Sequence, residues 1–312
     1  MKKNETLDSS DDEISLTELL SVLWHGKRVI ITGMFLFSAL SIVYALKQPN
    51  LYMSEVLLSP ADESNSDALG GLAGQFGGLA SLAGVNLSSG SNNQAQLAIE
   101  ILKSRKFIGS FIQKHKLLPN LMAAESWNAL ENKVIYDPKL YSIDSQEWVR
   151  AASFPYESKP SLQEAFKEFR EILNIETDKE SGMVKISIEF ISPYIAQQWV
   201  NWLVEDINQV MKERDVSEAN LSTDFLTSQL QKTKIADIRT ILYKLIEEQA
   251  KTIMLANVRD EYVFKTIDPA LVPEEKSGPK RALLCIVGAL LGAIIGVVFV
   301  TIRYLKKENA HR

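Results

Sequence analysis

The chain has 312 residues, enough for one large domain or two small ones. Residues 47–281 hold 26 basic and 32 acidic side chains, and this acidic balance excludes a surface built to bind nucleic acid. The single cysteine, Cys285, lies in an apolar run, so no disulfide is expected and the domain must be held by its own core or by subunit contacts.

The first elements expected are a tail and a surface helix. Residues 1–13 are polar and acidic, which predicts disorder. Ser15 and Glu18 fit a capping box at the start of a helix lying on a membrane surface. Its apolar face would be formed by Leu16, Leu19, Leu20 and Leu23.

Two uncharged runs, residues 29–46 and 282–302, are each long enough to cross a hydrocarbon core of about 30 Å. They predict two transmembrane helices, with 1–28 and 303–312 on one side of the membrane and 47–281 on the other. Lys and Arg near the spans number six on the side of the termini and four on the other. This difference favours cytoplasmic termini.

The first run has an alternative interpretation as a signal sequence, with Val43-Tyr44-Ala45 as a loose cleavage site. A leader of 28 residues that carries Glu5, Asp8, Asp11, Asp12 and Glu13 is too long and too acidic for that, so the transmembrane interpretation is preferred.

Beyond the first span, residues 52–58 predict a strand. Residues 68–90 contain seven of the fifteen glycines together with regularly spaced leucines, which suits either a mobile segment that docks on an apolar surface or a flexible loop. Residues 92–115 predict one helix, and residues 121–160 a mixture of helix and loop. Leu97, Ile101, Ile108 and Ile112 would share one face of this helix.

A capping box of Ser161 and Glu164 predicts a helix to about Arg170. Strands are then expected at 172–177 and 184–190, where apolar and polar residues alternate, with a Ser-Gly turn between them.

The longest helical stretch follows Ser192 as N-cap and Pro193 at the first helical position. No proline or glycine occurs from 194 to 268, so the helix can reach roughly 60 Å before a turn placed near Thr233. The returning segment repeats apolar residues at helical spacing, and packing between subunits is favoured. This seam consists of Ile235, Ile238, Leu242, Leu245, Ile253 and Ala256.

Catalytic chemistry is not indicated. There is no Walker A sequence, no metal-ligand cluster and no Gly-x-Ser-x-Gly turn. The three histidines, His25, His115 and His311, are interpreted as solvated. No catalytic, cofactor-binding or metal-ligating residue is therefore assigned, and the protein is not expected to be an enzyme.

Two features near the C-terminus are the candidate functional residues. Gly288, Gly292 and Gly296 form two overlapping Gly-x-x-x-Gly steps, which predict close helix packing with the first span or with another subunit. Three prolines in the segment before them predict a stiff, membrane-proximal strut over 268–281. The residues assigned to it are Asp268, Pro269, Pro273, Pro279, Lys280 and Arg281.

These residues carry a family resemblance. The run Phe264-Lys265-Thr266-Ile267-Asp268-Pro269-Ala270, continued through Pro273 and Pro279-Lys280-Arg281 into the glycine-stepped helix, resembles the C-terminal signature of the Wzz chain-length determinants, the polysaccharide co-polymerases. Ile14-Ser15-Leu16-Thr17-Glu18-Leu19-Leu20, with Trp24, Gly26 and Lys27, resembles the family's entry to its first span.

The resemblance implies an α+β membrane protein in which two transmembrane helices flank a periplasmic α/β base domain with a long helical arm. The base would comprise 47–192 and 257–270, and the arm 193–256. It also implies ring-shaped homo-oligomers in the bacterial inner membrane that set the length of lipid-linked O-antigen beside the Wzy polymerase.

Two other functions are weighed against O-antigen length control. One is an adaptor for capsule or exopolysaccharide polymerisation or export that works with a separate tyrosine kinase, since the short C-terminal tail departs from the branch with a fused kinase. The other is a membrane sensor, which would need a cytoplasmic output domain that the sequence lacks.

Overall fold

The computed structural model describes residues 24, 26–61 and 90–309. The chain divides into two compact units, one formed by 1–50 with 278–312 and the other by 51–277, and each is described by itself. The predicted disordered tail, the surface helix at 15–23 and nearly all of the glycine-rich segment 68–90 lie outside the described residues.

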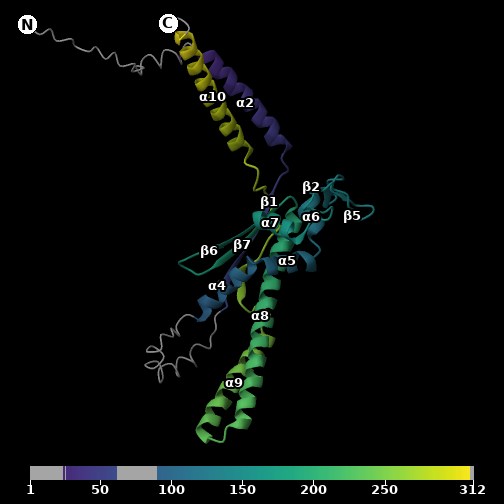
Figure 1. Ribbon diagram of the computed structural model, residues 1–312, viewed down its shortest axis with the longest axis vertical. Coiled ribbons are helices and arrows are strands. Elements are labelled where there is room, and N and C mark those ends of the chain that lie inside the picture. Colours follow the sequence, from purple (N-terminus) through teal and green to yellow (C-terminus); the bar gives the residue numbers. More distant parts are fainter. Residues whose placement is uncertain (1–23, 25, 62–89, 310–312) are drawn as a thin grey trace, which may run out of the picture. The chain divides into compact units, whose positions relative to one another are not determined.

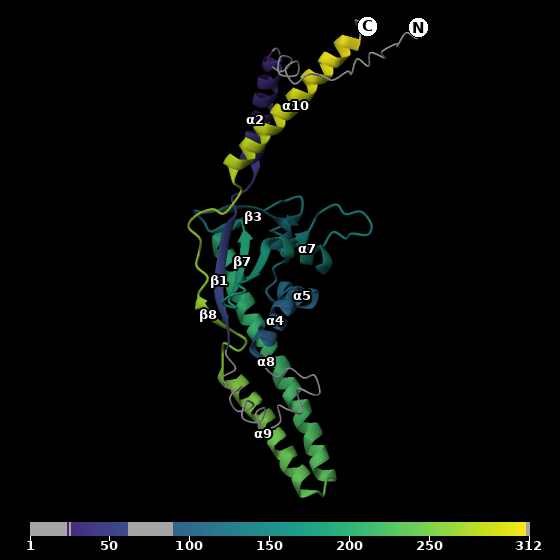
Figure 2. The ribbon, with the colours of Figure 1, turned by 90° about the vertical axis from the view of Figure 1, so that its left-hand side faces the viewer.

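The first unit is a hairpin of two antiparallel helices, α2 (Lys27–Lys47) and α10 (Arg281–Asn309), which pack side by side in Figures 1 and 2. Both helices are long and apolar enough to cross a membrane. Basic residues lie at both ends of α2 and at the start of α10, where a charged side chain can reach the interface of a bilayer.

The second unit is built on a four-stranded antiparallel sheet with the order β6-β7-β1-β8. Its strands are β1 (Tyr52–Pro60), β6 (Leu173–Thr177), β7 (Val184–Phe190) and β8 (Phe264–Asp268). The predicted strand at 184–190 is confirmed at both ends, and β1 continues past its predicted end because Ser59 and Pro60 pair with β8.

Alternation along the central strands sends one set of side chains into the core and the other to the opposite face of the sheet. In β7, Val184, Ile186 and Ile188 are fully buried. On the opposite face Lys185 of β7 forms an ion pair with Glu55 of β1, at 3.2 Å between nitrogen and oxygen. The sheet therefore has one covered face and one polar face.

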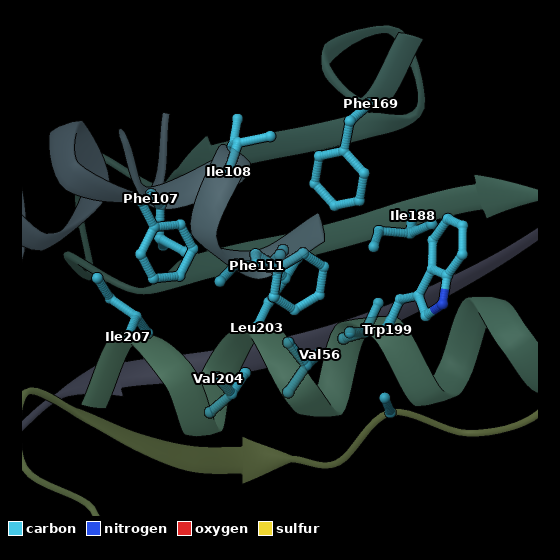
Figure 3. Packing of buried hydrophobic residues seen from close by; sticks show 14 of the residues in the cluster. Val56, Phe107, Ile108, Phe111, Phe169, Ile188, Trp199, Leu203, Val204 and Ile207 are labelled. Carbon is cyan, nitrogen blue, oxygen red and sulfur yellow. The ribbon is translucent and has the colours of Figure 1, made fainter. Parts of the chain in front are cut away.

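Helices α4 (Gly90–Leu102), α5 (Arg105–Lys114), α7 (Leu162–Ile172) and the first part of α8 (Pro193–Lys232) form the core with the covered face. Figure 3 shows the aromatic side chains of Phe107, Phe111, Phe169 and Trp199 at its centre. The predicted capping box at the start of α7 is confirmed, with Ser161 and Glu164 each bonding the backbone of the other.

The single helix predicted over 92–115 is wrong. It breaks into α4 and α5, because the hydroxyl of Ser104 accepts from the backbone N–H of Phe107 at 3.2 Å and caps a new helix. The predicted face is confirmed in its second half, where Ile108 and Ile112 are buried. In α4 it is wrong at Leu97, which is 37% exposed, whereas Ala98, Ile99 and Leu102 are buried.

The predicted mixture of helix and loop over 121–160 omits two small hairpins. After α6 (Leu118–Ala123), strands β2 (Ala124–Asn128) and β3 (Lys133–Tyr136) form one hairpin, and β4 (Tyr141–Ser142) and β5 (Glu147–Trp148) form the other. The turn of the first hairpin is set by side chains, since Asn128 accepts from the backbone N–H groups of Leu130 and Glu131.

The arm of the second unit consists of the far part of α8 and of α9 (Ala236–Val258), which folds back along it in Figures 1 and 2. The predicted N-cap is confirmed, because the hydroxyl of Ser192 accepts from Ile195 N at 3.4 Å. Helix α8 has 40 residues, or about 60 Å at 1.5 Å per residue, and ends with Thr233 as its cap.

The apolar seam predicted for the returning helix is only partly buried within one copy of the chain. Ile235, Ile238 and Leu245 are 59%, 42% and 44% exposed, whereas Ala256 is buried. Leu242, Ile246, Gln249 and Ile253 are half-buried and continue the line to Ala256 with helical spacing. One copy therefore covers only part of the predicted series and leaves Ile235, Ile238 and Leu245 exposed. The packing between subunits that was favoured for the seam stays a prediction.

Candidate functional site

The predicted glycine strip of α10 lies against α2. A Cβ atom placed on Gly292 would lie 2.7 Å from the carbonyl oxygen of Gly33 and 2.9 Å from Met34 Cα. A Cβ on Gly296 would lie 2.8 Å from Ile30 Cα. These distances are too short for any side chain, so the two backbones meet only because the residues are glycine.

The third glycine of the strip lies where a polar bond joins the same helices. A Cβ on Gly288 would be 2.5 Å from Ser41 Cβ. The hydroxyl of Ser41 donates to the carbonyl oxygen of Leu284 in α10 at 2.6 Å. Of the two partners predicted for the strip, another subunit or the first span, the hairpin places it against the first span.

The residues of the predicted strut do not form a free spacer. After Asp268 and Pro269, the carbonyl oxygen of Ala270 accepts from Gln197 Nε2 at 2.9 Å, and that of Leu271 accepts from Ser54 Oγ at 2.8 Å. Further along, the backbone N–H of Ser277 donates to Leu51 O at 2.9 Å. The segment is therefore fastened along β1 and α8, and Pro273 lies half-buried between these attachments.

The last strut residues belong to the helical hairpin. The guanidinium of Arg281 donates to Asn50 Oδ1 at 3.0 Å and to Gln48 O at 3.4 Å, joining the C-terminal end of α2 to the start of α10. Pro279 is half-buried and Lys280 is exposed. A functional role of the strut beyond these bonds remains a prediction.

His115 was predicted to be solvated, and this is wrong. Its side chain is 13% exposed, its Nε2 lies 3.0 Å from Asp206 Oδ2, and its ring stacks on Trp202 at 4.1 Å between centroids. Lys114 Nζ contacts the other oxygen of Asp206 at 2.5 Å. The cluster joins α5 to α8, and sequence reasoning missed it because its partners are about 90 residues apart in the chain.

Asn208 of α8 is another buried polar residue that the sequence did not indicate. Its Oδ1 accepts from the backbone N–H groups of Tyr262, Val263 and Phe264 at 3.1, 2.8 and 3.0 Å. Its Nδ2 donates to Phe264 O at 3.2 Å. The side chain of Asn208 thus binds the backbone at the start of β8 and fixes where the arm rejoins the sheet.

The outer surface of the arm carries large apolar side chains without a partner in the described part of the chain. Leu221 and Phe225 of α8 are 70% and 63% exposed. On α9, Ile241 and Val258 are 58% and 77% exposed. Apolar surface of this extent on a soluble domain commonly marks an interaction site.

No catalytic or metal-ligating residue is predicted from the sequence. Among the residues that the structure describes, no group of three or more His, Cys, Asp or Glu side chains could hold a metal ion. Burial acts to raise the pKa of Glu164, but hydrogen bonds from Ser161 and Arg150 outweigh it and lower that pKa. This carboxylate serves the helix cap and an ion pair with Arg150 at 2.8 Å.

Together these features define an α+β protein with two membrane-capable helices, a sheet-based base and a helical arm. Residues 12–115 match the family model described as Wzz, chain length determinant protein. This match confirms, over that part of the chain, the family resemblance that the sequence indicates. No curated protein matches the chain.

Two solved structures are similar to the chain. A full-length bacterial polysaccharide co-polymerase is 15% identical with a TM-score of 0.39, and the match covers 94% of this chain and 99% of that one. A fragment of WzzB, a polysaccharide co-polymerase from Salmonella Typhimurium, is 12% identical with a TM-score of 0.35, covering 73% of this chain and 100% of that one.

Proposed function

We propose that this chain is a non-enzymatic regulator of polysaccharide chain length that acts as a homo-oligomer in the bacterial inner membrane. The observation that carries the proposal is the match of residues 12–115 to the chain length determinant family. The two membrane-capable helices on either side of the domain support it. In this arrangement the termini are cytoplasmic and residues 51–277 lie in the periplasm.

The polymer is O-antigen in this proposal, and the protein works beside a Wzy-type polymerase on the lipid-linked polysaccharide. The role is to set how many repeat units are added, and it requires no bond-making group of its own. The chain's contribution is then a surface of fixed geometry, which the rigid attachment of α8 to the sheet would supply.

Assembly into a ring is proposed to use the outer surface of the arm. Leu221 and Phe225 of α8 are largely exposed, as are Ile241 and Val258 of α9. A narrow two-helix arm buries little of its own apolar surface, so a neighbouring copy that covers these side chains would gain the hydrophobic stabilisation that one copy lacks.

The helical hairpin is proposed to anchor each copy. The glycine strip faces α2 and is covered by it. On the rest of α10, Leu290, Ile294 and Phe299 are 59%, 60% and 57% exposed. Large apolar side chains on that surface suit lipid tails or the helices of a polymerase.

The test is the length distribution of O-antigen from a strain that lacks the gene, beside its complemented parent. The proposal predicts that clustered lengths in the parent become an unregulated ladder in the deletion strain and return on complementation. An unchanged O-antigen pattern contradicts it. If capsule or exopolysaccharide length changes instead, the adaptor function with a separate kinase replaces it.

A further inference from the structure

A groove lies in the base, between the β2–β3 hairpin and the first turns of α8. Its volume is about 890 Å³, within the range of roughly 300–1,000 Å³ that small-molecule sites occupy. We call it the hairpin–helix groove and define it by Asn132 and Tyr136 on the hairpin side and by Tyr194, Gln198, Asn201 and Trp202 on the helix side.

The helix side of the groove is a polar stripe with aromatic rings. Five residues of α8 line this side and share one face of the helix, because each lies three or four positions from another. They are Tyr194, Gln198, Asn201, Trp202 and Glu205. Gln198, Asn201 and Glu205 are exposed and have no side-chain hydrogen bond or ion pair within the described residues. Their donors and acceptors are free for a ligand.

The side of the groove opposite α8 presents two amide groups whose orientation is already fixed, one from the hairpin and one from α6. Asn132 Oδ1 accepts from Trp127 Nε1 at 3.0 Å, and Asn120 Oδ1 accepts from the hydroxyl of Tyr136. Each asparagine therefore keeps its NH₂ donors for a ligand. Burial, followed by the neighbouring Tyr141, raises the pKa of Tyr136, and its hydroxyl keeps the proton that it donates to Asn120.

The aromatic rings are also held in place before any ligand arrives. Trp202 stacks on His115 with 14° between the ring planes, and His115 is in turn held by Asp206. Tyr194 lies 6.2 Å from Trp127, between ring centroids. Rings fixed by packing lose little conformational entropy on binding, which favours affinity.

This combination points to one class of ligand. A sugar ring has an apolar C–H face that packs on an aromatic side chain, and hydroxyls that both donate and accept, which amide side chains match. A phosphate or other anion fits poorly, because Lys133 is the single cation among the described lining residues and Glu205 shares the site. We propose that the hairpin–helix groove binds a segment of the polysaccharide chain.

Binding without cleavage follows from the carboxylates. Glycoside hydrolysis generally uses a pair of them across the scissile bond, and Glu205 is the single one among the described residues that line the groove. The inference rests on the proposed function for the identity of the polymer. It adds that the growing chain contacts the base domain directly, at a site formed within one copy.

The experiment measures binding of oligosaccharides to the full chain in detergent micelles by isothermal titration calorimetry. The probes are lipid-free fragments of one to several repeat units, released by mild acid from the strain's own surface polysaccharide, with dextran fragments of equal size for comparison. The test variant is Y194A with N201A, which removes one ring and one amide from the exposed face of α8. The matched control is Y243A, because Tyr243 and Tyr194 are similarly exposed at 53% and 49%.

We expect the repeat-unit fragments to bind the wild type and Y243A equally, and the double variant to bind about tenfold more weakly. Equal affinity in the double variant, or no binding by the wild type, overturns the groove as a glycan site. Circular dichroism of each variant shows that it is folded. Length control is measured separately in cells. If the chain sets polymer length but the groove does not bind the fragments, this inference is refuted and the proposed function stands.

Discussion

The two parts of α8 differ in how much of their side-chain surface they bury. From Pro193 to Met211 the helix buries a side chain at almost every turn, including Trp199, Leu203 and Ile207. From Lys212 to its end at Lys232 it buries Ala219 alone among its described residues. The absence of breakers sets how long a helix can be, while packing decides how stable it is. The first part is therefore a core helix, and the second part is an arm whose apolar side chains are largely exposed.

The largest difference in the free energy of unfolding should come from truncating one aromatic side chain in each part of α8. Trp199→Ala removes a ring that is 1% exposed and packs on Phe169 and Phe190, so we expect a loss of about 3–5 kcal/mol in the free energy of unfolding of the base. Phe225→Ala in the arm should cost less than about 0.5 kcal/mol in dilute, monomeric protein. Urea unfolding in detergent micelles measures both, and equal losses would contradict the division of α8.

The next effect concerns the junction where the arm rejoins the sheet. Asn208→Leu keeps the shape of the side chain but leaves three backbone N–H groups without their acceptor, and we expect a loss of about 2–4 kcal/mol. Hydrogen exchange at residues 262–264 should accelerate. Gln209→Leu, on the exposed neighbour, is the control, and similar exchange in the two variants would show that Asn208 does not hold the junction.

A smaller effect is expected in the helical hairpin. Gly292→Leu forces apart α2 and α10, whose backbones meet at this residue, and overpacking of this kind costs about 1–3 kcal/mol. We expect weaker assembly in membranes and a broader distribution of polymer lengths. Val298→Leu on the exposed side of α10 is the control. Normal assembly and normal lengths in Gly292→Leu would refute a role for the glycine strip.

The smallest effect comes from the cap of α7. The folded-state pKa of Glu164 is lowered, so its contribution to stability is present above the unfolded pKa and is lost as pH falls through the folded pKa. Glu164→Gln should cost about 0.5–1 kcal/mol at neutral pH, within the range for helix caps. The difference from wild type should vanish in acid. A difference that persists at low pH would contradict the ionic role of this side chain.

The sequence predicted best where the signal is local. Alternation defined β7, and the pairs Ser161–Glu164 and Ser192–Pro193 located the starts of α7 and α8, because caps and strands follow from a few adjacent residues. The break at Ser104 was missed although serine is a common cap, since the apolar periodicity continued across it.

The candidate sites were harder to predict because they join distant parts of the chain. The glycine strip was visible as a motif, but its partner on α2 lies about 250 residues earlier, so two partners remained open. The hairpin–helix groove needs two short strands at 124–136, whose turn depends on Asn128 and Asn132, to lie beside α8. No periodicity encodes that arrangement, and His115 was misjudged for the same reason.

The measurement that tests the account most directly combines assembly with polymer length in one arm variant. Leu221→Asp with Phe225→Asp places charges on the exposed apolar surface of the arm, and Thr227→Asp on the same helix is the control. Light scattering of the purified protein and gel analysis of the polysaccharide should show smaller oligomers and an unregulated ladder for the double variant alone, with unchanged unfolding of the base. Full-size oligomers or clustered lengths in that variant would contradict length control by an assembly built through the arm.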